Sequence, residues 1–115
     1  MKLVITIVTA ILVIGMTILP ALAGSVQNGK KLFNDSRFAG ATAGKSCASC
    51  HPDGKGIEGA ADKQTFTVMG QDSASLEDAI NMCIKMALKG KPIAKNSSEM
   101  QDVVAYIKSL GPTKR

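Results

Sequence analysis

Three cysteines and one histidine are the residues of this 115-residue chain best suited to chemistry, and three of them stand together in Cys47-Ala48-Ser49-Cys50-His51. Two thiols at this spacing lie about one helical turn apart, with an imidazole directly after them. The C-x-x-C-H pattern is typical of c-type haem attachment, in which both thiols add to the vinyl groups of one porphyrin and the imidazole binds iron. It predicts one covalently attached haem c on Cys47 and Cys50, with His51 as the proximal iron ligand.

Two other uses of these side chains are open. Cys47 and Cys50 can form a simple disulfide and leave His51 on the surface. Alternatively, these three residues and Cys83 can form a zinc site with three cysteines and one histidine. Zinc ligands normally stand in pairs separated by two or more residues, whereas Cys50 and His51 are adjacent. The spacing therefore favours haem.

The motif does not name the sixth, distal ligand of the iron. His51 is the only histidine, so a second histidine from the same chain is excluded. At about 100° per residue, a helix through residues 76–88 turns Cys83 to its apolar side, Met86 to the rim and Met82 outward. Met69 lies in a loop, and Met100 falls on the apolar stripe of the last helix. A thiolate ligand would hold ferric iron at low potential, whereas a thioether would raise the potential.

The first 23 residues have the features of a secretory signal peptide. Lys2 precedes an apolar run over residues 3–19, Pro20 ends the run, and Ala21-Leu22-Ala23 supplies a cleavage site. We therefore expect residues 1–23 to be a signal peptide, residues 24–115 to form one domain, and the protein to be exported, into a periplasm. The alternative is an uncleaved membrane anchor. Export agrees with haem attachment of this kind, which takes place after export.

Helices must position the motif. Apolar spacing predicts helices over 26–35, from Ser75 to residue 88 and from Ser98 to residue 110, with a short helix at 47–51. The glycine-rich residues 36–74 are otherwise irregular, and no strand is evident. The fold class is therefore all-α, with three to four helices wrapped around one haem. One tyrosine and three phenylalanines make a thin core for so small a domain, and a haem would fill it.

The chain after residue 23 resembles class I cytochrome c. That family has an early helix with a glycine and an aromatic residue, then the haem motif, then a final helix with an aromatic residue, and Gly29, Phe33, Val103 and Tyr106 match those positions. The resemblance implies that the first and last helices cross at Gly29. In the commoner pattern a methionine ligand lies before the final helix, but residues 89–97 contain none.

A second segment is similar to the haem domains of thiosulfate dehydrogenases and related sulfur-oxidising cytochromes. The similarity covers residues 80–106 and rests on the segments Ile80-Asn81-Met82-Cys83, Gly90-Lys91-Pro92, Ser98-Glu99-Met100 and Ala105-Tyr106. In those proteins a cysteine after Ile-Asn is the distal iron ligand. The resemblance thus implies Cys83 as distal ligand, with Met86 and Met69 as alternatives. Those enzymes typically carry two haem domains, and this chain has one haem motif.

Lysines are frequent around the haem motif and after the second long helix, and the chain has a formal net charge of +5. They form either an ordinary solvated face or a positive rim that steers acidic redox partners: Lys45, Lys55, Lys85, Lys89, Lys91 and Lys95. Nucleic acid is not expected as a partner, and a membrane only if the signal segment stays attached. We expect a single-electron carrier between redox proteins. The alternative is an enzyme or enzyme subunit that oxidises a sulfur compound at a Cys-ligated haem.

Overall fold

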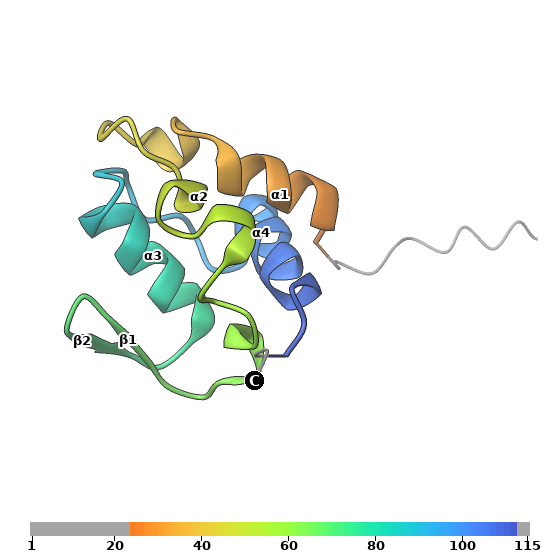
Figure 1. The fold of residues 1–115 in the computed structure, drawn as a ribbon. Helices are drawn as coiled ribbons and strands as arrows, with labels where there is room; N and C mark the ends of the chain where they lie inside the picture. The colour runs from red at the N-terminus through yellow and green to blue at the C-terminus, as the bar shows by residue number, and fades with distance from the viewer. Residues whose placement is uncertain (1–23, 113–115) are drawn as a thin grey trace, which may run out of the picture.

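A computed structural model describes residues 24–112 of the chain (Figure 1). Over this range four α-helices, three single 3-10 turns and one two-stranded hairpin are present. The helices are α1 (Val26–Asn34), α2 (Cys47–Cys50), α3 (Leu76–Met86) and α4 (Ser98–Ser109). The 3-10 turns are η1 (Phe38–Gly40), η2 (Pro52–Gly54) and η3 (Ala60–Asp62), and the strands are β1 (Phe66–Val68) and β2 (Gln71–Ser73). The predicted signal peptide, residues 1–23, lies outside the described residues.

The long helices start at serine caps. Ser25 accepts a hydrogen bond from Asn28 N at the start of α1, and Ser75 accepts one from Asp78 N at the start of α3, as predicted. The predicted start of α4 at Ser98 is confirmed, and the residue that caps it is the preceding Ser97, which accepts from Met100 N. Among residues 24–112, no helix is both long and apolar enough to span a bilayer.

The expectation of an all-α fold without strands is wrong in one place. β1 and β2 form an antiparallel hairpin in which Phe66 pairs with Ser73 and Val68 with Gln71. Its two turn residues, Met69 and Gly70, both have positive φ, at 50° and 79°, as a tight two-residue hairpin turn requires. Three-residue strands are too short to give a readable alternation of apolar and polar residues, and methionine is not a typical residue for such a turn.

Helices α1 and α4 cross in close contact, and this pair forms one side of the molecule (Figure 1). The approach requires Gly29, because a Cβ atom there would collide with the Asp102 carbonyl group of α4. Beside it, the rings of Phe33 and Tyr106 meet edge to face with centroids 5.0 Å apart. The Asp102 carboxylate also accepts a 2.6 Å hydrogen bond from Ser25 N. The crossing at Gly29 is the one that the class I resemblance implies.

Helix α3 packs on the other side of the core, where Ile84 and Met100 are fully buried. Its C-terminal end is tied to the chain just before the haem motif. Leu88 O accepts hydrogen bonds from the N–H groups of residues 42 and 43 at 3.1 and 3.0 Å, and Lys91 N donates to Ala39 O at 2.8 Å. These bonds hold α3 next to the segment that leads into α2.

Candidate functional site

A cavity of about 410 Å³ lies among α2, α3, the hairpin and the inner side of α4. Its volume is within the range of small-molecule and cofactor sites. Most of its lining side chains are apolar, and they come from every part of the fold: Phe33, Ile57, Phe66, Leu76, Ile80 and Val103 are among them. The polar and sulfur-bearing groups that reach it are few, and they include Cys47, Cys50, His51 and Cys83.

The two motif cysteines form the ends of α2, a single helical turn. This turn starts at Ser46, which is buried and whose N–H donates to Ser49 Oγ at 2.9 Å. Cys47 is partly buried and Cys50 is exposed. Burial, followed by the neighbouring Cys83 thiol, raises the pKa of Cys47 to about 11, so the free thiol is protonated at neutral pH. The two thiols thus stand at different depths along one side of the cavity.

His51 directly follows α2, and its ring is oriented by a hydrogen bond. Nδ1 lies 3.0 Å from the carbonyl oxygen of Lys55. A carbonyl can only accept, so Nδ1 carries the proton and Nε2 keeps its lone pair free. A hydrogen bond of this type fixes the tautomer and ring orientation of metal-binding histidines. The arrangement therefore leaves Nε2 available as an iron ligand.

Cys83, which belongs to α3, lines the same cavity. It is partly buried. Burial and then the Cys50 thiol raise the pKa of Cys83, which is the same effect as at Cys47. All three thiols line this one cavity. The cavity is thus lined by a thiol on α3 and by an imidazole directly after α2.

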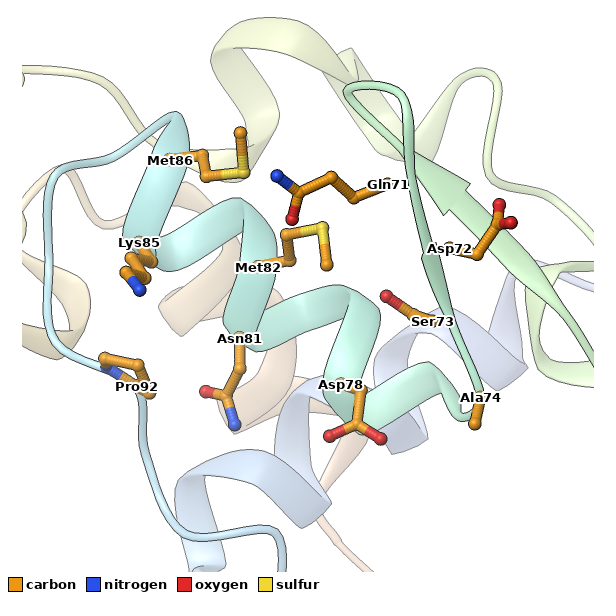
Figure 2. Close-up of a pocket in the computed structure, with 10 residues that line it drawn as sticks. All are labelled: Gln71, Asp72, Ser73, Ala74, Asp78, Asn81, Met82, Lys85, Met86 and Pro92. Atoms are coloured by element: carbon orange, nitrogen blue, oxygen red, sulfur yellow. The ribbon is translucent and has the colours of Figure 1, made fainter.

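The methionines considered as distal ligands lie in different places. Met69, in the hairpin turn, lines the cavity but is 62% exposed. Met86 does not line the cavity: together with Met82 it lines a separate groove on the outer side of α3 (Figure 2). Met100 is buried in the core. Of the predicted distal ligands, the structure thus brings Cys83 and Met69 to the cavity and leaves Met86 outside it.

Asn81 is a supporting residue to which the sequence assigned no role. Its side-chain amide donates to Ile93 O and accepts from Ile93 N, both at 2.8 Å. These two bonds fasten the loop after α3 to the helix two positions before Cys83. The sequence marked Asn81 only as part of the Ile80-Asn81-Met82-Cys83 segment of the resemblance, which does not reveal the backbone group that its amide meets.

The alternatives to haem find no support in this geometry. Over residues 24–112, no three side chains of the His, Cys, Asp or Glu type gather into a metal-binding group, as the zinc site would require. All three cysteines are free thiols. A haem fits the residues present, because an apolar cavity of this size, two thiols one turn apart and an oriented imidazole are the groups that hold one.

Comparison with known families agrees with this fit. A sequence model described as "SoxA/TsdA, cytochrome c domain" matches residues 28–112. No curated protein and no solved structure matches the chain. The matched range covers α2, α3, α4, the hairpin, α1 from its third residue on, and every residue of the candidate site. A cytochrome c domain implies a covalently attached c-type haem and haem-based electron transfer.

Proposed function

The chain belongs to the SoxA/TsdA cytochrome c domain family, and on this premise we propose that it is an exported monohaem cytochrome that carries single electrons between redox partners. The observation that carries the proposal is the apolar cavity onto which Cys47, Cys50, His51 and Cys83 converge. The signal-peptide features of residues 1–23 support export to a periplasm. One C-x-x-C-H motif supports a single haem.

Each residue of the site would have its own role in binding the haem. Cys47 and Cys50 would hold the haem through two thioether bonds, each formed by addition of one S–H across one vinyl group, a reaction that needs no oxidant. His51, held by Lys55 O, offers Nε2 to the iron. When bound, the haem supplies a one-electron iron couple. The apolar walls exclude water, which lowers the local dielectric constant and so tunes that couple.

Cys83 is our proposed distal ligand, and Met69 and Met86 are the alternatives. Cys83 is partly buried, lines the cavity and sits on a helix that Asn81 fastens to the following loop. Met69 also lines the cavity, but its side chain is mostly exposed at a hairpin turn. Met86 would have to leave its groove outside the cavity to reach iron. A ligand on a rigid helix is held more accurately than one on a turn.

Lysines support the choice of partner. Lys45, Lys55, Lys85, Lys89 and Lys91 are exposed, and over residues 24–112 no salt bridge is found for any of them. Lys95, the sixth of the set, pairs with Asp78 at 2.7 Å. Unpaired surface cations raise the encounter rate with acidic proteins more than they raise affinity. We propose acidic redox proteins as partners, without nucleic acid, and with a membrane only if residues 1–23 remain attached.

A second candidate function is oxidation of a sulfur compound, as an enzyme or enzyme subunit. The family match and the position of Cys83 at the cavity favour it. Against it, residues 24–112 contain a single arginine, Arg37, which does not line the cavity. An anionic sulfur substrate would need several cations at its binding site.

One experiment separates the two functions. The purified ferric holoprotein is mixed with thiosulfate, and the haem absorption bands are followed. A carrier stays oxidised with thiosulfate alone and is reduced rapidly by a redox partner, whereas a thiosulfate-oxidising enzyme is reduced by thiosulfate directly. Absence of any haem spectrum from the exported protein would contradict both functions.

A further inference from the structure

A groove on the outer face of α3 forms a second site that the electron-transfer function does not use. It has a volume of about 560 Å³, lies between β2 and α3, and shares no lining residue with the haem cavity. Figure 2 shows the Met82 and Met86 side chains of α3 and the Gln71 amide of β2 extending toward one another across this groove. The groove thus collects two thioethers and one amide.

Core packing does not explain the two methionines. Met82 and Met86 stand four positions apart on α3, so their Cβ atoms lie about 5–6 Å apart on one face of the helix. Neither belongs to the hydrophobic core or to the partly buried residues that pack against it, whereas Met100 is fully buried there. Two neighbouring thioether sulfurs therefore lie at a groove on the surface.

The polar groups of the groove are of two kinds. Neither carboxylate faces the two methionines as a free ligand: Figure 2 shows Asp72, which accepts from Thr67 Oγ1 at 2.8 Å, pointing away from them, and Asp78 pairs with Lys95. The Gln71 amide makes no hydrogen bond with the described part of the chain. Ser73 Oγ is the buried side-chain oxygen of this part that lacks a partner, and its residue is only 7% exposed. Buried hydroxyls normally have partners, so the Ser73 hydroxyl is a polar group of the groove whose hydrogen-bonding capacity is unused.

We propose that Met82, Met86 and Gln71 bind a soft monovalent cation, Cu(I). Thioether sulfur selects Cu(I) over the harder divalent ions. Calcium and magnesium need several carboxylate or carbonyl oxygens, which the described residues do not place beside the methionines, because Asp72 points away from them (Figure 2) and Asp78 pairs with Lys95. Lys85 lies at the same groove and adds a positive charge, which repels a divalent ion more strongly than a monovalent one. The Gln71 amide oxygen supplies a neutral third donor.

Competition for Cu(I) tests the site directly. The reduced, anaerobic holoprotein is titrated into Cu(I) held by a coloured chelator, bicinchoninate. We expect one Cu(I) per chain to leave the chelator. Met82→Leu or Met86→Leu keeps the size and apolar character of the side chain but removes a sulfur, and each should weaken Cu(I) binding by at least about tenfold. The double variant should not withdraw Cu(I), and unchanged withdrawal by it overturns the proposal.

Two control variants test whether copper binding is specific to the groove. Met69→Leu removes a more exposed thioether outside the groove, so equal loss of Cu(I) binding in this variant would mean non-specific binding and would overturn the site. The haem absorption and ferric EPR spectra of Met86→Leu should equal those of the parent protein. A changed EPR spectrum would identify Met86 as the distal iron ligand, which is incompatible with a copper site in the groove.

Discussion

At the scale of single residues, the proposed distal ligand Cys83 has the largest expected effect on the redox potential of the haem. A thiolate donates charge and stabilises ferric iron, whereas a thioether stabilises ferrous iron. We expect Cys83→Met to raise the midpoint potential, within the roughly 0.8 V range that axial ligands cover in haem proteins. We also expect it to change the low-spin ferric EPR signal. A redox titration with EPR on the holoprotein measures both quantities.

The matched variant at this position is Cys83→Ala, which removes the sulfur and keeps a small apolar side chain. If Cys83 binds iron, this variant loses the parent's low-spin EPR signal and takes up carbon monoxide in the ferrous state, because the sixth position is open. If Cys83 is only a small buried side chain, the EPR spectrum of Cys83→Ala equals that of the parent protein, and Cys83 is not the ligand. Met69→Leu then becomes the variant to measure.

At the scale of elements, the crossing of α1 and α4 depends on the missing side chain of Gly29. A Cβ atom there would collide with the Asp102 carbonyl group and lie 2.8 Å from Tyr106 Cβ. Alanine has a helix propensity about 1 kcal/mol better than glycine, but overpacking of this kind costs about 1–3 kcal/mol, occasionally more. We therefore expect Gly29→Ala to lower the free energy of unfolding, measured by denaturant titration.

A control variant in the same helix separates the effect of the α1–α4 contact from the effect of helix propensity. Lys30→Ala lies on the exposed side of the same helix and should change stability by less than about 0.5 kcal/mol. If Gly29→Ala instead stabilises the protein by about 1 kcal/mol, propensity governs the position, and the two helices do not approach as closely as described.

The start of α3 gives a pH-dependent prediction. Hydrogen bonds from Lys95 and then Ser75 lower the pKa of Asp78. A lowered pKa means that the stabilisation is present above the ordinary carboxyl pKa of about 3.9 and is lost as the pH falls through the lower folded value. Asp78→Asn should therefore be less stable than the parent at pH 7. This difference should shrink progressively as the pH falls below about 4, and denaturant midpoints from pH 7 to pH 3 measure it.

Because the pair is exposed to solvent, the effect is expected to be small and to weaken in high salt. Lys95→Met serves as the partner variant. Substituting Asp78 in the Lys95→Met background should have less effect than in the parent, since the main cause of the lowered pKa is already gone. An equal effect in both backgrounds would mean that Ser75 alone is responsible.

The same scale shows what the sequence could predict and why. The helices α1, α3 and α4 have 9 to 12 residues, serine caps and apolar stripes, so local patterns reveal them. The hairpin was missed because its strands have three residues each. Helical geometry predicted that Cys83 faces inward and Met82 outward. The structure agrees, because Cys83 lines the haem cavity and Met82 lines the groove on the outer side of α3. Local sequence patterns cannot predict that Met69 lines the cavity or that Asn81 bonds to Ile93, because both contacts depend on how the loops fold back onto the helices.

At the scale of the whole molecule, the haem cavity is an unfilled part of the core of a small domain. The cavity is open to solvent beside the exposed Cys50 and Met69, so without haem its apolar walls stay in contact with water and lose the stabilisation of about 25 cal/mol per Å² that burial would give. Small domains have a total stability of about 5–15 kcal/mol. Haem binding and folding should therefore be one event in this protein.

The Cys47→Ser and Cys50→Ser double variant, which cannot attach haem covalently, tests this coupling. Without haem we expect it to lack a cooperative thermal transition and near-ultraviolet circular dichroism, while added haem should restore part of both by binding to the native state. His51 remains in this variant to offer Nε2. A single cooperative transition in the haem-free chain would show that the helices α1, α3 and α4 hold the fold alone, and that the cavity is a binding site rather than a missing part of the core.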